Sequence, residues 1–186
     1  MLTREAIVAS ARKQVEEHGF ETVSLRAVAR DLGVTAPALY DHVESKADLL
    51  ALIAGEGFEE MVAGFGSIEA VVSTERLRAR AVAYVGFAVD HPELFRLMFQ
   101  YRPVEVAIEV DNELGAATRA FELNLADIHQ AIVDGRLPGR DAVELAIMLW
   151  SAIHGVATVA MMMPGEPHGN LAGGVIDAML SGLQPG

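Results

Sequence analysis

The sequence contains no cysteine among its 186 residues. This absence excludes disulfide bonds, thiolate catalysis, iron–sulfur clusters and zinc sites built on Cys ligands. A long apolar run is also missing near the N-terminus, where charges at Arg4, Glu5, Arg12 and Lys13 interrupt any signal-peptide core. Both absences favour a cytoplasmic location.

The alternation of apolar and polar residues that is typical of strands is missing from every long stretch. Apolar residues instead recur at helical spacing along nearly the whole chain. Hydrophobic residues make up 52% of the sequence and charged residues 22%, which is enough apolar material for a sizeable core. The sequence therefore predicts an all-α fold.

Positive charge is scarce, with 14 Lys and Arg against 26 Asp and Glu, a net charge of -12. Residues 1–46 hold six of the basic residues and seven of the acidic ones, a net charge of -1, so the remaining -11 belongs to the rest of the chain. An acidic surface repels nucleic acid and anionic membranes. The surplus of acidic residues therefore belongs to the C-terminal part of the chain.

One stretch, residues 145–163, has no charged residue and is about as long as a membrane span. Polar residues interrupt it at Ser151, His154 and Thr158, and its flanks are mostly acidic. A helix buried on every side is the favoured interpretation, and we expect no membrane association.

Local signals divide the chain into a small head and a larger body. The expected helix caps in the head are Thr3, Ser24, Thr35 and Ser45, and the expected stops are Gly19 and Gly33. Because Ser45 opens a fourth helix, the boundary is expected near residue 46, with a three-helix domain over 1–46 and a helical domain over 47–186. In the body, helices are expected over 74–90, 92–100, 103–134, 139–163 and 171–183.

The most informative segment runs from Ser24 to Lys46. Two short helices joined by a turn with Gly33 form a helix-turn-helix, whose second helix enters the major groove of DNA. The expected core of this segment is Leu25, Val28, Ala29, Leu32, Val34, Leu39 and Val43. Small and polar residues are left outside, which suits a surface that approaches a duplex closely.

This segment resembles the TetR family of transcriptional regulators. The matching residues are Leu32-Gly33-Val34, Pro37, Leu39-Tyr40, His42-Val43 and Lys46. In the body, Trp150-x-x-x-His154-Gly155 and His91-Pro-Glu-Leu-Phe-Arg96 are similar to a recurrent C-terminal subtype of that family. The resemblance implies a homodimeric regulator, expected to be a repressor, that binds a palindromic double-stranded operator and is released by a small apolar effector.

The resemblance also implies which residues contact DNA. The expected set is Ser24, Arg26, Thr35, Ala36, Pro37, Ala38, Tyr40, Asp41, His42 and Lys46. Within it, Tyr40, His42 and Lys46 are expected on phosphates, and Arg26 on a base edge or a phosphate. Ala36 and Ala38 offer only methyl contacts, and Asp41 either accepts from a cytosine amino group or is repelled by phosphate.

The body is expected to hold the effector site and the subunit interface. Large adaptable side chains predict a ligand cavity lined by Tyr84, Phe87, Phe95, Met98, Phe99, Tyr101, Phe121, Met148, Trp150 and His154, although each could equally be core. A stripe of small and apolar residues predicts a dimer interface at Ala142, Leu149, Ile153, Val156, Ala157 and Ala160, the alternative being burial inside one subunit.

No motif for catalysis or for metal or cofactor binding occurs in the sequence. The chain is therefore not expected to be an enzyme, and we expect neither a metal nor a cofactor. The competing hypothesis is a helical bundle that binds or converts a small molecule and has lost DNA binding, which Asp41 and the net charge of -12 favour.

Overall fold

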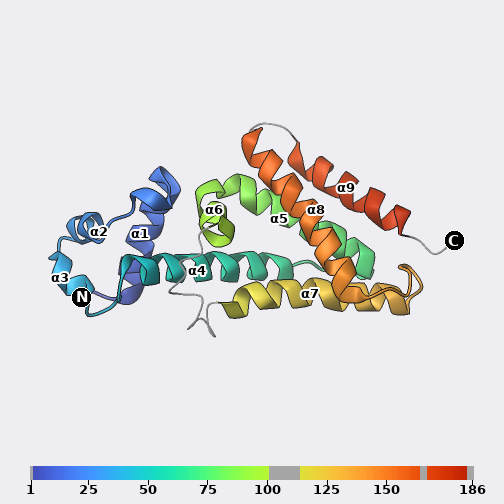
Figure 1. Cartoon of the computed structure of the whole chain (residues 1–186), viewed down its shortest axis with the longest axis horizontal. Helices are drawn as coiled ribbons and strands as arrows, with labels where there is room; N and C mark the ends of the chain where they lie inside the picture. Colours follow the sequence, from blue (N-terminus) through green and yellow to red (C-terminus); the bar gives the residue numbers. More distant parts are fainter. Residues whose placement is uncertain (1, 101–113, 164–166, 184–186) are drawn as a thin grey trace. The chain divides into compact units, whose positions relative to one another are not determined.

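The computed structural model describes residues 2–100, 114–163 and 167–183, and every regular element within them is a helix, which confirms the all-α prediction. The elements in chain order are α1 (Arg4–His18), the short 3-10 helix η1 (Phe20–Thr22), α2 (Leu25–Asp31), α3 (Ala36–Leu39), α4 (Lys46–Gly66), α5 (Ser73–Asp90), α6 (Pro92–Gln100), α7 (Leu114–Val133), α8 (Ala142–Met162) and α9 (His168–Gly182) (Figure 1).

The chain forms two compact units, each built from two separate stretches of the sequence. Unit 1 comprises Met1–Glu60 with His91–Ala117, and unit 2 comprises Met61–Asp90 with Thr118–Gly186. The first part of α4 and all of α6 therefore pack with the three-helix head. Gly57 of α4 permits this packing, because a Cβ at that position would lie 2.7 Å from the Met98 sulfur of α6.

The head helices begin and end at the expected residues. The Thr3 hydroxyl accepts a hydrogen bond from the Ala6 N–H, and the Ser24 hydroxyl accepts one from the Ala27 N–H. Gly19 and Gly33 adopt φ values of 82° and 67°, which favour glycine. The predicted caps and stops of the first two helices are thus confirmed, and η1 is an element that the sequence did not predict.

Helix α3 is shorter than expected. It ends at Leu39, and the chain continues through turns over residues 40–42. Leu39 and Val43 are nevertheless buried at 0% and 1% exposure, as predicted. Asp41 therefore lies in the turn that follows the helix and not within the helix.

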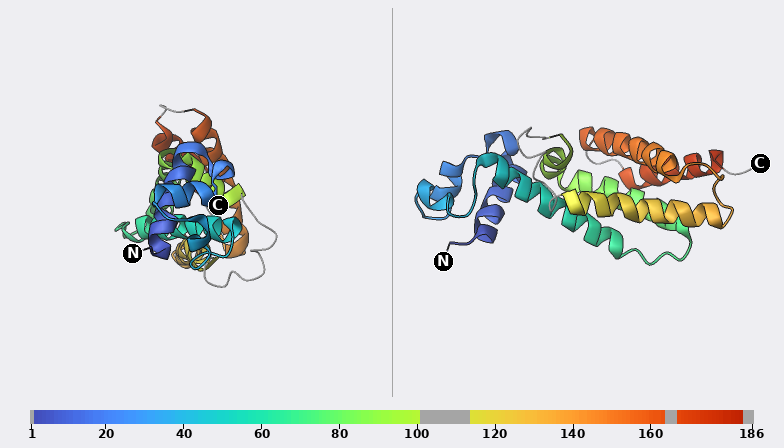
Figure 2. Two further views of the ribbon diagram at one scale, coloured as in Figure 1. Left: turned by 90° about the vertical axis from the view of Figure 1, so that its left-hand side faces the viewer. Right: turned by 60° about the horizontal axis from the view of Figure 1, so that its bottom comes forward.

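In unit 2, α5 packs along both α8 and α9, which Figures 1 and 2 show side by side. Asp141 caps α8 by accepting from the N–H groups of Val143 and Glu144, so this helix begins three residues later than expected. Helix α9 begins at His168, three residues before the predicted start. The predicted start of the preceding helix at Pro103 lies outside the described residues.

By length and composition, α8 is the one described helix that could cross a membrane, with a mean hydropathy of 1.8. The core helices of soluble proteins pass the same test. Only one face of α8 is buried against its own chain, and the other is exposed, with Met162 at 77%, so the prediction of a helix buried on every side is wrong.

Candidate nucleic-acid interface and effector site

A small apolar core holds α2 and α3 at a fixed angle to each other. Val28, Ala29, Leu39 and Val43 are at most 2% exposed, whereas Leu25, Leu32 and Val34 are only half-buried. The N–H of Val34 donates to the carbonyl of Ala29 over 2.9 Å, which closes the turn after α2. Because this core lies on one side of α3, the other side of the helix is left to solvent.

The solvent side of α3 and of the turn after it carries most of the predicted DNA-contacting residues. Thr35, Pro37, Tyr40 and Asp41 are exposed, and Ala36, Ala38 and His42 are partly exposed. Tyr40 shows 59% of its surface, so its ring and its hydroxyl are accessible to a partner. The Thr35 hydroxyl makes no capping hydrogen bond and so remains available for a phosphate.

Three further predicted residues lie at the starts of α2 and α4. The Ser24 hydroxyl oxygen already accepts the capping hydrogen bond from the Ala27 N–H, so a phosphate contact at Ser24 must form alongside this bond. Arg26 is exposed and has no hydrogen bond or ion pair within the described part of the chain. The Lys46 amino group donates to the Glu21 carbonyl over 2.9 Å, so it must leave or share this bond to reach DNA.

Arg4 is a residue of this surface that the sequence did not indicate. Its Nε donates to the carbonyl of His42 over 3.0 Å, which ties the turn after α3 to the first turn of α1. The two residues are 38 positions apart, so only the folded chain shows their contact. Arg4 thereby helps to fix the position of Tyr40 and His42.

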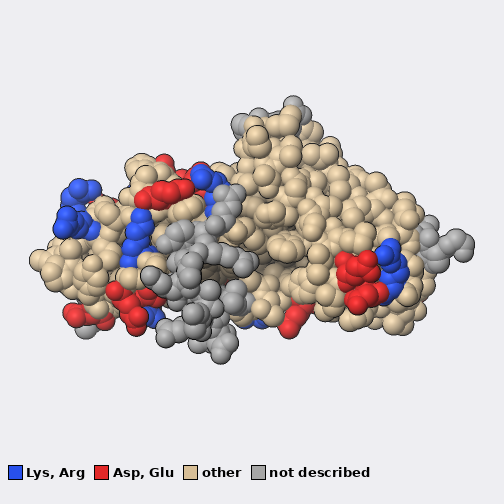
Figure 3. Space-filling model, in the orientation of Figure 1, with Lys and Arg blue, Asp and Glu red and all other residues tan. Residues whose placement is uncertain are grey.

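Both signs of charge occur on this unit. Figure 3 shows basic side chains over α2 and acidic side chains a short way along the same face. Arg30 is 80% exposed and lies 4.0 Å from Asp31, a distance too long for strong pairing. Any attraction to DNA therefore comes from a few basic groups and is expected to depend strongly on salt.

In unit 2, three of the predicted ligand residues meet through hydrogen bonds. The Trp150 Nε1–H donates to the Tyr84 hydroxyl over 3.3 Å, and that hydroxyl lies 2.8 Å from His154 Nδ1. Tyr84 is 6% exposed, and burial raises its pKa well above the value for free tyrosine. Burial also lowers the pKa of His154, so its neutral form is favoured.

These bonds define the proton positions in the trio. The indole N–H only donates, so the Tyr84 oxygen accepts it and its own hydrogen can point to His154 Nδ1. A neutral His154 that accepts at Nδ1 carries its proton on Nε2. The Trp150 N–H and the Tyr84 O–H are therefore both engaged within the trio.

The remaining predicted ligand residues do not all join this trio. Phe95, Met98 and Phe99 belong to α6 in unit 1, where Phe95 packs against Phe99 with ring centroids 4.7 Å apart. Met148 is two residues before Trp150, which turns it about 200° around α8, so the two cannot line one cavity. Phe87 and Phe121 are half-buried in unit 2, and Tyr101 lies outside the described residues.

Comparison with known proteins identifies the family. Residues 7–53 match the model described as bacterial regulatory proteins, tetR family, and residues 77–172 match the tetracyclin repressor-like C-terminal domain. The chain belongs to the TetR family of transcriptional regulators. It is a DNA-binding transcriptional regulator and not an enzyme, as the sequence predicted.

Individual relatives and solved structures are similar to this chain over most of its length. The uncharacterized HTH-type transcriptional regulator Rv0681 of Mycobacterium tuberculosis is 28% identical over 86% of this chain and 71% of its own length. A structure of a protein of unknown function from Rhodococcus sp. RHA1 has 28% identity, a TM-score of 0.85, and coverage of 98% of this chain and 95% of that one. PfmR of Thermus thermophilus, titled a TetR family regulator, shares the fold at a TM-score of 0.74 and 21% identity, over 96% of this chain and 99% of its own.

The predicted dimer stripe of this TetR-family chain is buried within its own unit. Its six residues, Ala142, Leu149, Ile153, Val156, Ala157 and Ala160, are between 0% and 9% exposed. They lie on the side of α8 that packs against α5 and α9. Burial inside one subunit, the alternative interpretation of the stripe, is therefore what the structure shows, and these side chains have no surface left for a partner.

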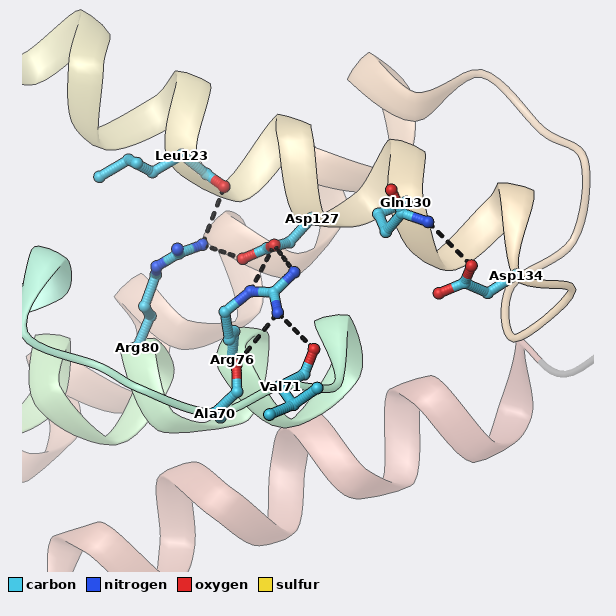
Figure 4. A network of polar contacts seen from close by, with 8 residues as sticks. All are labelled: Ala70, Val71, Arg76, Arg80, Leu123, Asp127, Gln130 and Asp134. Atoms are coloured by element: carbon cyan, nitrogen blue, oxygen red, sulfur yellow. Dashed lines mark hydrogen bonds and ion pairs between the residues drawn. The ribbon is translucent and has the colours of Figure 1, made fainter.

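A buried ion network in unit 2 was not predicted at all (Figure 4). Asp127 of α7 is 5% exposed and forms ion pairs with two arginines. Its Oδ1 lies 2.7 Å from Nε and 2.5 Å from Nη2 of Arg76, and its Oδ2 accepts from Nη1 of Arg80. Arg76 also donates to the carbonyls of Ala70 and Val71. No local sequence signal points to this network, because Asp127 lies 51 and 47 positions from its two arginines.

Proposed function

We propose that this TetR-family regulator is a repressor that binds a palindromic operator as a homodimer and leaves it when a small molecule binds in unit 2. The observation that carries the proposal is the exposed face of α3 and its following turn, above a core that holds the helix at a fixed angle to α2. TetR regulators bind operators and small effectors and dimerise. A cytoplasmic location is part of the proposal.

On the operator, we assign phosphate contacts to Tyr40, His42 and Lys46, and a base edge or phosphate to Arg26. The 59% exposure of Tyr40 supports its role, and so does the absence of an acidic partner at Arg26 among the described residues. Ala36 and Ala38 offer methyl groups to thymine, whereas Asp41, in the turn, faces either a cytosine amino group or a phosphate.

For the dimer, we now assign the opposite face of α8. Ile147, Val159 and Met162 are 49%, 46% and 77% exposed there, and the small residues Ser151 and Gly155 lie between them. Figure 3 shows a broad area without charged side chains over most of α8. A second copy of the same face would cover these apolar groups and let the two helices approach closely.

For the effector, the Tyr84, Trp150 and His154 trio is the best supported part of the predicted cavity. The polar atoms of the trio would contact one end of a molecule whose remaining surface contacts apolar side chains. Effector binding releases DNA if it favours a conformation in which the two heads no longer match successive major grooves.

Selection from a random-sequence duplex pool at low and moderate salt tests the DNA-binding part. The purified full chain should enrich an inverted repeat, and Arg26→Ala should weaken binding and relax the preference at some position of the repeat. Arg140→Ala in unit 2 removes the same charge at an exposed residue and should leave binding unchanged. Failure to enrich any sequence, even at low salt, would contradict the proposal.

The dimer is tested by sedimentation of two charge substitutions on α8. Ile147→Glu should give folded monomers, since it places a charge on the exposed face, and the matched Ile153→Glu should unfold unit 2, since Ile153 is 5% exposed. If Ile147→Glu remains a dimer at the wild-type concentration, the interface lies elsewhere.

A further inference from the structure

The six basic residues of the first 46 positions fall into two groups, with and without an acidic partner. Three of them have a carboxylate oxygen within 4.0 Å, namely Arg12, Lys13 and Arg30. Among the described residues the other three have none, and these are Arg4, Arg26 and Lys46. Arg26 and Lys46 are already proposed as DNA contacts. Arg4 has the same unneutralised charge, which makes it available to a phosphate.

The side chain of Arg4 is held at the surface that is proposed to bind DNA. Its Nε donates to the carbonyl oxygen of His42 over 3.0 Å, so the guanidinium lies against the turn that carries Tyr40 and His42. Figure 1 shows the start of α1 beside α3, in agreement with this contact. A long side chain that is already held in place loses less conformational entropy when it binds a partner.

Most of the hydrogen-bond donors of Arg4 are unused. A guanidinium group has five N–H groups in one plane. Within the described part of the chain, the Nε–H of Arg4 is the one that finds an acceptor. Because the residue is exposed, the four N–H groups on Nη1 and Nη2 can donate to an acceptor outside the protein. Two parallel N–H groups match two oxygens of a phosphate.

Glu5 is the acidic residue that follows Arg4 in the sequence. Its pKa is lowered first by hydrogen bonds with its own backbone N–H and with Thr3, and less by the charges of Arg4 and His42. Glu5 is exposed, and it forms no ion pair with Arg4 in the described part of the chain. Water and salt therefore screen its charge, and Arg4 keeps its own for a partner.

We propose that Arg4 binds a phosphate of the operator backbone, and that its bond to the His42 carbonyl holds the guanidinium in position for this contact. The inference rests on the proposed DNA-binding surface and adds to it a residue outside the helix-turn-helix segment. A phosphate contact reads no base, so Arg4 adds affinity without sequence preference. One side chain thus joins α1, the turn after α3 and the DNA backbone.

The salt dependence of DNA binding measures this contact. Each phosphate contact that is lost lowers the slope of log affinity against log salt concentration by about 0.9. The purified full chain is titrated by fluorescence anisotropy, at several salt concentrations, onto a labelled duplex with the inverted repeat enriched from the pool and onto a scrambled duplex of equal length. Arg4→Gln should weaken binding to both duplexes by about tenfold and lower the slope by about 1 for each bound head.

Two further variants separate a phosphate contact from a purely structural role. Arg4→Lys keeps the charge and should keep the slope, but it should bind about threefold more weakly, since lysine lacks the planar group that meets carbonyl and phosphate together. Lys13→Gln removes the same charge from an exposed residue of the same helix, one that pairs with Glu17, and should bind like wild type. Arg4 is exposed and makes one hydrogen bond, so its variants should fold, which thermal unfolding verifies.

Two results would overturn the inference. An unchanged slope in Arg4→Gln would show that Arg4 only fixes the turn, whatever the loss of affinity. A loss confined to the enriched repeat would do the same, because losing a phosphate contact weakens binding to all sequences alike. In both cases the wild type still binds its repeat, so the proposed function stands. If the wild type enriches no repeat, the proposed function fails first, and the role of Arg4 falls with it.

Discussion

Asp127 should be among the most sensitive residues of unit 2, and Asp127→Asn is the substitution that shows it. The amide has nearly the shape of the carboxylate but no charge. It leaves Arg80, at a side-chain exposure of 8%, buried without its counter-charge beside the partly exposed Arg76, at 22%. The hydrogen bond to Asp127, which raises the pKa of Arg76, is weakened at the same time.

The expected cost follows from the burial of the pair. Removing one partner of a buried ion pair costs about 3–5 kcal/mol, because the other charge stays desolvated and uncompensated. Arg80→Met should cost much less, about 1–2 kcal/mol, since Asp127 keeps Arg76 and only the Leu123 carbonyl loses its donor. The two substitutions remove opposite charges from one contact, and their costs should differ by about twofold or more.

Urea unfolding followed by circular dichroism measures both costs. The double variant Asp127→Asn with Arg80→Met completes a double-mutant cycle and should be more stable than Asp127→Asn alone, because it removes one of the two uncompensated charges. Arg140→Met, at an exposed pair with Glu144, is the control and should change stability by less than about 0.5 kcal/mol. Equal costs for Asp127→Asn and Arg80→Met would refute the argument that Asp127 is the counter-charge of both arginines.

Three further predictions address other parts of the chain. Gly57→Ala should destabilise by about 1–3 kcal/mol in urea unfolding because its Cβ meets Met98, whereas Gly64→Ala in the same helix has open space and should stabilise by up to about 1 kcal/mol. Burial lowers the pKa of His154, so below about pH 6.5 the unfolded chain binds a proton at this residue more readily than the folded chain does. The free energy of unfolding of the wild type should therefore fall as the pH falls below about 6.5, and it should fall less in His154→Gln. Ser24→Asp should keep the helix cap and the thermal stability but weaken DNA binding in an anisotropy titration, whereas Ser24→Ala should cost about 1 kcal/mol of stability. Equal DNA affinity for Ser24→Asp and wild type would exclude a phosphate contact at this residue.

The head was predictable because its signals are local. A capping hydroxyl, a glycine of positive φ and apolar residues one turn apart each act within a few positions, as Thr3, Gly19 and Ser24 show. The end of α3 at Leu39 was missed because the Tyr40–His42 segment has no glycine or proline to mark it. The backbone N–H of Val43 still donates to the carbonyl of Leu39, four residues earlier, so the turn continues the hydrogen-bonding pattern of an α-helix.

Contacts between distant residues were not predictable in this way. Arg4 with the His42 carbonyl, and Asp127 with Arg76 and Arg80, join positions that no spacing rule connects. Single-sequence periodicity shows that a residue is on an inner face but not what it meets there. Asp127 is polar on an inner face, so its pairing with an arginine could be expected, but not the identity of that arginine.

Helix α8 shows why an interface is harder to predict than a core. Between residues 145 and 163 both of its sides are apolar, so periodicity has no contrast from which to tell the side that packs on α5 and α9 from the side that faces outward. The stripe of small residues was assigned to a partner because small residues permit close approach, yet that close approach is made to the chain's own helices. Ser151 and Gly155 are likewise small residues, but they lie on the exposed side of α8. A helix that is apolar all round therefore requires two partners, and only the position of the first one, inside the chain, reveals which face is left for the second.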